Sequence, residues 1–273
     1  MNTFDELGLH PSLTRALTAL AFKTPTPIQE KAIPPALDGR DVLGLAQTGT
    51  GKTAAFGLPM LNALLESGRA PVGGAARALV LAPTRELAAQ IETSLSAFAA
   101  QGAALKIGVV VGGAPMNRQI KMLRGGLDVL VATPGRLLDL ADRGAVRLGA
   151  TRFLVLDEAD QMLDLGFMPA LKKIAAMVGA DRQTLLFSAT MPKEIAALAA
   201  RFLADPVRVE VTPPGRTADK IAQSVRFVAD AAEKIEALRD ALAAEPGALA
   251  LVFARTKRGA DRLAKKLVAA GID

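Results

Sequence analysis

The sequence of 273 residues contains no cysteine and a single histidine, His10. Without cysteine there is no disulfide framework, and one histidine alone cannot build a zinc site of the usual Cys/His type. No apolar run approaches the roughly 18–20 residues that a membrane-spanning helix needs. The start, Met1–Glu6, lacks the basic and apolar segments of a secretory signal peptide. These absences predict a cytoplasmic protein that makes no use of a membrane.

Hydrophobic residues make up 51% of the chain, which is enough for a packed core and argues against disorder. The net charge is +6, from 33 basic and 27 acidic residues, and the excess is spread along the sequence. A positive excess suits a polyanionic partner but does not demonstrate one.

A glycine-rich segment, residues 46–53, stands between an apolar run and a helical pattern. Such a turn points successive backbone N–H groups inward, and the helix start adds a partial positive charge. Lys52 is expected to reach the β- and γ-phosphates of a nucleotide, and the Thr53 hydroxyl to bind magnesium. The expected phosphate-binding residues are Ala46, Gln47, Thr48, Gly49, Thr50, Gly51, Lys52 and Thr53. The segment therefore predicts a nucleoside triphosphate site.

Two carboxylates, Asp157 and Glu158, follow the apolar run 153–156 about a hundred residues downstream. Ligands of open α/β sheets bind at the carboxyl ends of the strands, where these side chains are expected to lie. Asp157 is predicted to hold Mg²⁺ through water, and Glu158 to polarise the attacking water. With Lys52, these residues form the expected catalytic set.

Apolar, β-branched runs alternate with helical patterns through the first three quarters of the chain. The expected strands are 41–46, 78–82, 107–111, 128–132, 153–157, 184–188 and 207–211. Strands that are apolar on both faces and separated by helices indicate an α/β fold, with a parallel sheet covered by helices on both faces. The first domain is predicted to span residues 1–211.

A Pro/Gly-rich stretch then predicts a linker at residues 212–220. Past it, the patterns predict a strand near 223–228, a helix near 231–243, a strand near 249–253 and a helix near 257–270. These two βα units, within residues 221–273, are too few for a second domain of the first one's size. The sequence is therefore expected to be truncated.

Several motifs, in kind and order, resemble the DEAD-box RNA helicases of superfamily 2. Asp157-Glu158-Ala159-Asp160 matches the motif that names that family, and Ala46–Thr53 matches its version of the phosphate loop. The resemblance covers the whole chain and implies a RecA-like P-loop domain plus part of a second RecA-like domain. Residues 256–261 are most similar to the bacterial RhlE type.

The segment 22–29 resembles the adenine-reading Q motif of this family, which implies nucleotide contacts for Phe22, Thr24 and Gln29. A carboxamide can donate and accept at once, which matches the edge of adenine. Gln29 could instead cap the turn after Pro27, and Phe22 could be a core residue. Phe4 is expected to pack the N-terminal segment onto the domain.

Three further motifs resemble the RNA-contacting motifs of the family's first domain, and each follows an expected strand. Backbone N–H groups and arginines at such positions suit phosphate and sugar, so little sequence specificity is expected. The alternative for each arginine is a surface ion pair. The expected RNA-binding residues are Pro83, Thr84, Arg85, Gly112, Gly113, Thr133, Pro134, Gly135 and Arg136.

Ser188 and Thr190 match the motif that links hydrolysis to strand separation, and their hydroxyls are expected to bond Asp160. The family's arginines that stabilise the transferred phosphoryl group belong to late motifs, and this sequence contains no match to them. The resemblance therefore implies that the chain binds ATP, Mg²⁺ and RNA but hydrolyses ATP poorly.

Three functions remain open from the sequence. The favoured one is an RNA-stimulated ATPase that separates short duplexes, the activity of an ATP-dependent RNA helicase. The second is an ATP-gated RNA-binding clamp that holds a partner. The third is a DNA translocase or another P-loop ATPase, against which the Q-like segment and residues 83–88 argue.

Overall fold

The computed structural model describes residues 3–102, 105–211, 222, 224–245 and 247–272. Its contacts divide the chain into two compact units, Met1–Arg216 and Thr217–Asp273. The predicted linker, 212–220, lies outside the described residues. None of the helices in the described part of the chain combines the length and the apolar character that a bilayer crossing requires.

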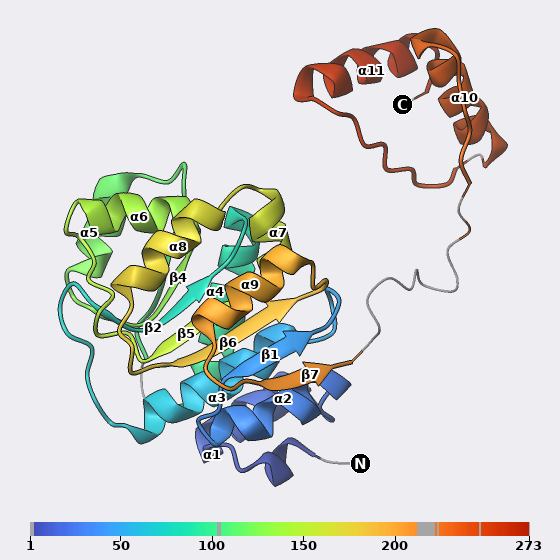
Figure 1. Ribbon diagram of the computed structural model, residues 1–273. Helices are drawn as coiled ribbons and strands as arrows, with labels where there is room; N and C mark the ends of the chain where they lie inside the picture. Colours follow the sequence, from blue (N-terminus) through green and yellow to red (C-terminus); the bar gives the residue numbers. More distant parts are fainter. Residues whose placement is uncertain (1–2, 103–104, 212–221, 223, 246, 273) are drawn as a thin grey trace. The chain divides into compact units, whose positions relative to one another are not determined.

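The first unit is built on a seven-stranded parallel sheet with the order β3-β4-β2-β5-β6-β1-β7 (Figure 1). All seven strands expected in this unit are present, and their ends differ from the predicted ones by at most two residues. The strands are β1 Val42–Leu45, β2 Ala76–Leu81, β3 Ile107–Val110, β4 Leu127–Ala132, β5 Phe153–Leu156, β6 Gln183–Ser188 and β7 Val207–Glu210.

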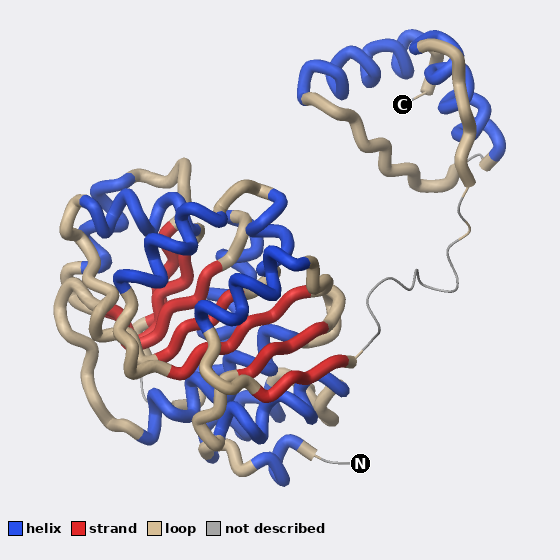
Figure 2. Tube along the Cα trace, in the orientation of Figure 1, coloured by secondary structure: helices blue, strands red, loops and turns tan. Residues whose placement is uncertain are grey.

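Side chains along each central strand point alternately to the two faces of the sheet, and both faces are buried. In β2, Val80 belongs to one core cluster, whereas Leu79 and Leu81 belong to the other. Helices therefore cover both faces, as Figures 1 and 2 show. The α/β class predicted from the sequence is confirmed.

One core cluster lies between the sheet and the helices near the N-terminus. These elements are the 3-10 helix η1 Phe4–Leu7 and the helices α1 Pro11–Ala19, α2 Pro27–Leu37, α3 Lys52–Glu66 and α4 Arg85–Ala99. The other cluster lies under the later helices. These are α5 Met116–Leu123, α6 Pro134–Asp142, α7 Ala159–Asp164, α8 Met168–Met177 and α9 Lys193–Phe202.

The described part of the second unit contains two helices, α10 Ala231–Ala244 and α11 Lys257–Ala269, close to the predicted ranges. Each helix begins at an N-cap residue whose side chain accepts hydrogen bonds from the first turn. For α10, the Asp230 side chain accepts from the backbone N–H groups of Ala232 and Glu233. For α11, Thr256 Oγ1 accepts from the backbone N–H of Gly259. Neither helix has a buried residue.

The two strands predicted for the second unit are wrong for the residues that the structure describes there, 224–228 and 249–253. Their apolar side chains are exposed, with Phe227 and Phe253 at 92% and 88%. A strand requires a partner for its backbone groups and a surface to cover its side chains, and an isolated strand pair is marginal in water. Neither segment has such a partner among the described residues.

Candidate functional site: a nucleotide cleft and an adjoining loop cluster

The phosphate loop joins the carboxyl end of β1 to the start of α3, as predicted. Gly49 and Gly51 have φ values of +77° and +93°, which side chains rarely adopt. A Cβ at position 51 would also clash with the Gln29 side chain. Thr50 Oγ1 donates to the carbonyl of Gln47 at 2.8 Å and tightens the turn. Both glycines are therefore required by the shape of the loop.

Sheet order brings the phosphate loop beside the two acidic motif residues. β1 pairs with β6, and β6 pairs with β5, so the carboxyl ends of these strands lie next to one another. The Ala46 backbone N–H donates to the carbonyl of Ser188 at 3.1 Å. Asp157 and Glu158 follow β5 directly, and the N–H of Glu158 donates to Asp157 Oδ1 at 3.0 Å.

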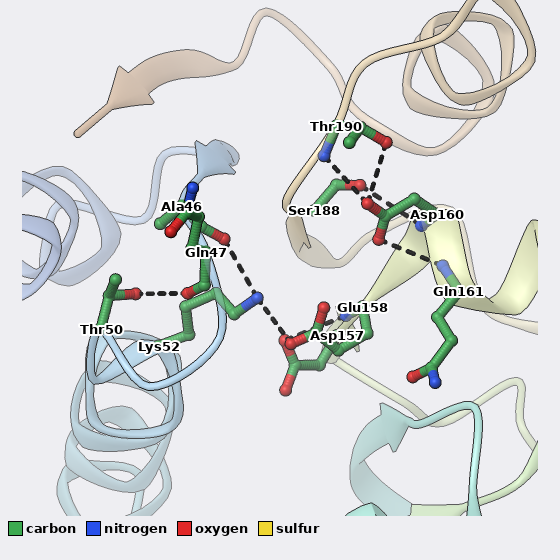
Figure 3. A network of polar contacts seen from close by, with 10 residues as sticks. All are labelled: Ala46, Gln47, Thr50, Lys52, Asp157, Glu158, Asp160, Gln161, Ser188 and Thr190. Carbon is green, nitrogen blue, oxygen red and sulfur yellow. Dashed lines mark hydrogen bonds and ion pairs between the residues drawn. The ribbon is translucent and has the colours of Figure 1, made fainter. Parts of the chain in front are cut away.

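Lys52 lies at the centre of the polar network in Figure 3. Its Nζ donates to Glu158 Oε1 at 2.7 Å and to the carbonyl of Ala46 at 3.2 Å. Both charged side chains are almost fully buried. Glu158 has φ +51°, in the left-handed region, at the N-cap of α7. Lys52 thus links the two predicted halves of the site across 106 residues of sequence.

Burial raises the pKa of the Asp157 carboxyl from 3.8 to about 7. The Lys52 ammonium lowers this pKa, while the neighbouring carboxylates of Glu158 and Asp160 raise it. A dication beside Asp157 would favour its ionised form. A bound cation would therefore stabilise the ionised form of Asp157, which burial alone disfavours.

A cleft of about 510 Å³ opens over the phosphate loop and the acidic residues. Lys52, Thr53, Asp157 and Glu158 all line it. Its full lining is Thr48, Gly49, Gly51, Lys52, Thr53, Thr84, Glu86, Leu87, Gln90, Asp157, Glu158 and Gln161. The volume lies in the range of small-molecule sites, which is about 300–1,000 Å³.

Sequence reasoning missed three polar residues of this lining, Glu86, Gln90 and Gln161. Glu86 and Gln90 are one turn apart on α4, so they share a helix face. Gln161 follows Asp160 directly. Glu86 lies inside the predicted segment 83–88, although no nucleotide contact was expected of it, and the available signal for Gln90 was its helical spacing from that segment.

Gln29 performs the capping that the sequence left open as an alternative. Its Oε1 accepts from the N–H of Thr26 at 2.9 Å, and its Nε2 donates to the carbonyl of Gly51 at 3.0 Å. The side chain is 2% exposed. Gln29 thus ties the start of α2 to the phosphate loop, and its contact with adenine remains a prediction.

Phe22 and Thr24 are not brought into the cleft. The ring of Phe22 makes edge contacts with Phe4 and Phe98, at centroid distances of 6.2 and 5.7 Å. Phe4 is buried, as expected for a residue that packs the N-terminal segment. Phe22 remains 39% exposed, and Thr24 is exposed as well. Their nucleotide contacts remain predictions.

Asp160 is joined to both residues of the predicted coupling motif (Figure 3). Its Oδ2 accepts from the N–H and the hydroxyl of Thr190, both at 2.9 Å. Its backbone N–H donates to Ser188 Oγ at 3.3 Å. The predicted hydroxyl contacts therefore exist, and the acidic motif is connected to the end of β6.

The three loops predicted to contact RNA form one cluster at the carboxyl ends of β2, β3 and β4. The Arg85 side chain lies against Gly113, where a Cβ would clash with it. Arg136 Nη1 donates to the carbonyl of Ala114 at 3.0 Å. Neither arginine has an ion pair with a described residue. The ion-pair alternative is therefore not what the structure shows.

The other residues of this cluster mostly position its backbone. Thr84 caps α4 by accepting from the N–H of Leu87 at 3.2 Å, and it also lines the nucleotide cleft. Pro83, Thr133 and Pro134 are buried, whereas Gly135 is exposed. The cluster thus adjoins the cleft through Thr84.

Comparison with known proteins identifies the family. Residues 26–198 match the family model described as DEAD/DEAH box helicase. The chain belongs to this family. The match includes the phosphate loop, the acidic motif and the Ser188–Thr190 segment, so the resemblance predicted from the motifs is confirmed. The RhlE subtype remains a prediction.

The chain is 43% identical over 269 residues to the ATP-dependent RNA helicase CshA of Limosilactobacillus reuteri, covering 98% of this chain and 52% of that protein. It is 43% identical over 265 residues to the ATP-dependent RNA helicase DeaD of Klebsiella pneumoniae, covering 97% of this chain and 40% of that protein. The chain thus spans about half the length of the curated relatives it matches.

Among solved structures, the chain is similar to a DEAD box protein from the hyperthermophile Methanococcus jannaschii. The TM-score is 0.71 at 36% identity, covering 98% of this chain and 70% of that one. This similarity supports the same α/β fold for the first unit.

Proposed function

We propose that this chain binds ATP with Mg²⁺ and belongs to an RNA-stimulated ATPase that separates short RNA duplexes. The single observation that carries the proposal is the convergence of Lys52, Thr53, Asp157 and Glu158 on one cleft. The similarity to relatives named as ATP-dependent RNA helicases supports the reaction class.

The residues present fit a magnesium ion of the kind that nucleotides bring with them. Mg²⁺ is usually held by one or two carboxylates, waters and substrate phosphates, without a protein cage. The described residues include no cluster of three or more His, Cys, Asp or Glu that would form such a cage. Asp157 and the Thr53 hydroxyl line the same cleft and are the residues that would hold the ion. When bound, Mg²⁺ neutralises charge on the phosphates.

Lys52 and Glu158 are the residues whose contacts change when a triphosphate binds. Phosphate oxygens in the loop compete with Glu158 for the Lys52 ammonium, which is now 2.7 Å from that carboxylate. Transfer of Lys52 to the phosphates frees Glu158 to accept a hydrogen bond from the attacking water. In this proposal, one movement of Lys52 both binds the phosphates and leaves Glu158 free to act as the general base.

Asp160 is proposed to carry the state of the cleft to the end of β6. It sits three residues after Asp157 and holds Thr190 through two hydrogen bonds of 2.9 Å. The loop cluster of Arg85, Gly113 and Arg136 is proposed to bind the sugar-phosphate backbone of RNA. Thr84 lines the cleft and also belongs to this loop cluster, so the proposed nucleotide site and the proposed RNA site share this residue.

We infer slow hydrolysis for this chain by itself, because no arginine lines the described part of the cleft. An arginine that stabilises the transferred phosphoryl group contributes about 10³–10⁵ in rate. Residues 221–273 are proposed to be the opening of a second RecA-like domain.

The test is ATP turnover by this chain with and without single-stranded RNA, alongside ATP binding by calorimetry. The Glu158→Gln variant supplies the background rate, and single-stranded DNA as a competitor addresses the DNA translocase alternative. We expect measurable Mg²⁺-dependent ATP binding and turnover near that background. Absent ATP binding would refute the nucleotide site. Fast RNA-stimulated turnover that Glu158→Gln abolishes would refute the inferred slow hydrolysis.

A further inference from the structure

A second basic site lies away from the nucleotide cleft, where α5 and α6 end. A hollow of about 370 Å³ is lined by Arg124, Arg143 and Arg147 together with glycine backbone. No acidic residue lines it within the described chain. None of the motifs discussed above includes these arginines.

The floor of this hollow, which we call the arginine hollow, is fixed by backbone contacts. The N–H of Arg147 donates to the carbonyl of Gly74 at 2.8 Å, and its Nη2 donates to that of Gly73 at 2.9 Å. The N–H of Gly74 in turn donates to the carbonyl of Leu123 at 3.1 Å. Three segments distant in sequence are therefore held together before any ligand binds.

The other two arginines carry charges that the described protein does not neutralise. Arg124 and Arg143 are exposed, and neither side chain has a hydrogen bond or ion pair with a described residue. Asp139 precedes Arg143 by one turn of α6, yet it forms no ion pair with it. Both arginines follow helix C-termini, where a cation is favourable because of the helix dipole. That effect explains a single charge at each helix end but not the meeting of three in one acid-free hollow.

The exposed face of α5 continues the positive charge toward the RNA loop cluster. Arg118 and Lys121 are exposed and precede Arg124 by six and three residues, so the three project from one side of the helix. α5 begins just after Gly113 and Ala114, which contact Arg85 and Arg136. A basic face about 12 Å long, given eight residues at 1.5 Å each, thus leads from that cluster to the arginine hollow.

We propose that the arginine hollow and the basic face of α5 bind backbone phosphates of an RNA strand that extends beyond the loop cluster. This inference rests on the proposed RNA binding at that cluster. A linear polyanion matches a row of unpaired cations better than a compact ligand does, because its charges repeat along the same line. Arginine suits phosphate oxygens through its planar fork of donors.

The test measures binding of oligouridylates of increasing length to the complete chain, in the presence of Mg²⁺ and a non-hydrolysable ATP analogue. The strand must extend past the loop cluster by about the 12 Å length of α5, so the series must include RNA that is a few nucleotides longer than the cluster alone can hold. We expect the double variant Arg124→Gln/Arg143→Gln to match the unmodified chain on short RNA and to lack the gain in affinity on longer RNA.

The salt dependence gives a second readout on the longer RNA. Each phosphate neutralised on a single strand contributes about 0.7 to the slope of log affinity against log salt, so the double variant should lose about 1.4. A four-fold rise in salt should then weaken the unmodified chain about seven-fold more than the variant. Lys172→Gln/Arg201→Gln removes the same charge from exposed positions on α8 and α9 and is the matched control.

Equal behaviour of the two double variants on every RNA would overturn the proposal. Polyglutamate serves as a probe for an acidic protein partner. If Arg124→Gln/Arg143→Gln lost binding to polyglutamate but kept its RNA binding, the proposal would be overturned in favour of such a partner. The variant Arg85→Gln/Arg136→Gln separates this failure from failure of the proposed function. If RNA binding depends on that pair and not on the arginine hollow, only the further inference is wrong; if the unmodified chain binds no RNA, both are.

Discussion

Two segments of similar apolar composition differ in structure: the one in the first unit is a buried strand, and the one in the second unit is exposed and is not a strand. Phe153-Leu154-Val155-Leu156 is a central strand whose last three residues are 0% exposed. Leu249-Ala250-Leu251-Val252-Phe253 is at least as apolar, yet Leu251 and Phe253 are 81% and 88% exposed and no strand is described there. β5 has β2 on one side and β6 on the other. Strand formation is therefore decided by the neighbours that pair with a segment and by the helices that cover it.

The helices of the two units provide the most sensitive test of this difference. α4 buries Ala88, Ile91, Leu95 and Phe98, whereas α10 and α11 bury nothing. Isolated helices of about 12–15 residues are marginal in water. Amide hydrogen exchange followed by mass spectrometry should show α4 opening only at the global stability, about 5–15 kcal/mol, and α10 opening at close to zero. Comparable protection in both would mean that the second unit has a core of its own.

Truncation of a phenylalanine should have unequal effects in the two units. Phe187 is fully buried and its ring packs on that of Phe56 at 5.7 Å. Phe187→Ala should lower the free energy of unfolding by about 3–5 kcal/mol, as measured by urea denaturation. Phe227→Ala, at 92% exposure, should change it by less than about 0.5 kcal/mol. Similar losses for the two variants would contradict the comparison.

The interior of the first unit raises the pKa of a carboxyl group, that of Asp157. The pKa of Asp157 is raised from 3.8 to about 7, so the folded state holds this proton between those values while the unfolded state releases it. The free energy of unfolding should therefore fall as pH rises from about 4 to about 7, on the order of a few kcal/mol. Urea denaturation across that range should show the slope, and Asp157→Asn should remove it.

The control for that experiment is Asp261→Asn, which changes an exposed carboxyl on α11. It should leave the pH dependence of the parent unchanged. A slope that persists in Asp157→Asn would assign the effect to another group. Added Mg²⁺ and ATP should flatten the slope in the parent, because a cation next to Asp157 favours the ionised carboxylate.

A methyl group added to β1 should give the smallest of these effects. A Cβ at Gly44 would lie 2.5 Å from the ring of Phe187, so Gly44→Ala forces the neighbouring strand to adjust. The expected loss is about 1–3 kcal/mol by thermal or urea unfolding. Gly125→Ala adds the same methyl group where nothing lies within 4 Å and should be close to neutral. A neutral Gly44→Ala would show that β1 packs less tightly than described.

Most strands of the first unit could be predicted because their residues are apolar on both faces and form short runs between helical patterns. Asp157 and Lys52 could be predicted from motif and spacing. The contact between Lys52 and Glu158 could not be predicted, because it depends on β1 and β5 both lying next to β6 in the sheet. Local sequence patterns do not reveal the order of the strands in a sheet.

Gln29 shows a different limit of the sequence. Its positions in a capping pattern and in a nucleotide motif were both visible, and the cap on Thr26 is local. Its bond to the Gly51 carbonyl could not be predicted, because Gly51 lies 22 residues away. Among the described residues, the strands expected at 223–228 and 249–253 are absent for the complementary reason. Their composition was read correctly, but composition does not supply a neighbour.

The left-handed backbone of Glu158, with φ +51°, has a consequence for engineering. A non-glycine residue in this region is strained, and the adjacent Asp157 is a carboxyl held where burial disfavours its charge. A neutral residue at 157 would relieve the cost of that burial, whereas glycine at 158 would relieve the backbone but leave the buried Lys52 ammonium without its carboxylate partner. Selection of this domain for heat resistance alone would therefore tend to replace Asp157 early. Thermostable variants should be screened for turnover at every round, because the most stabilising changes and the most damaging ones are expected at the same place.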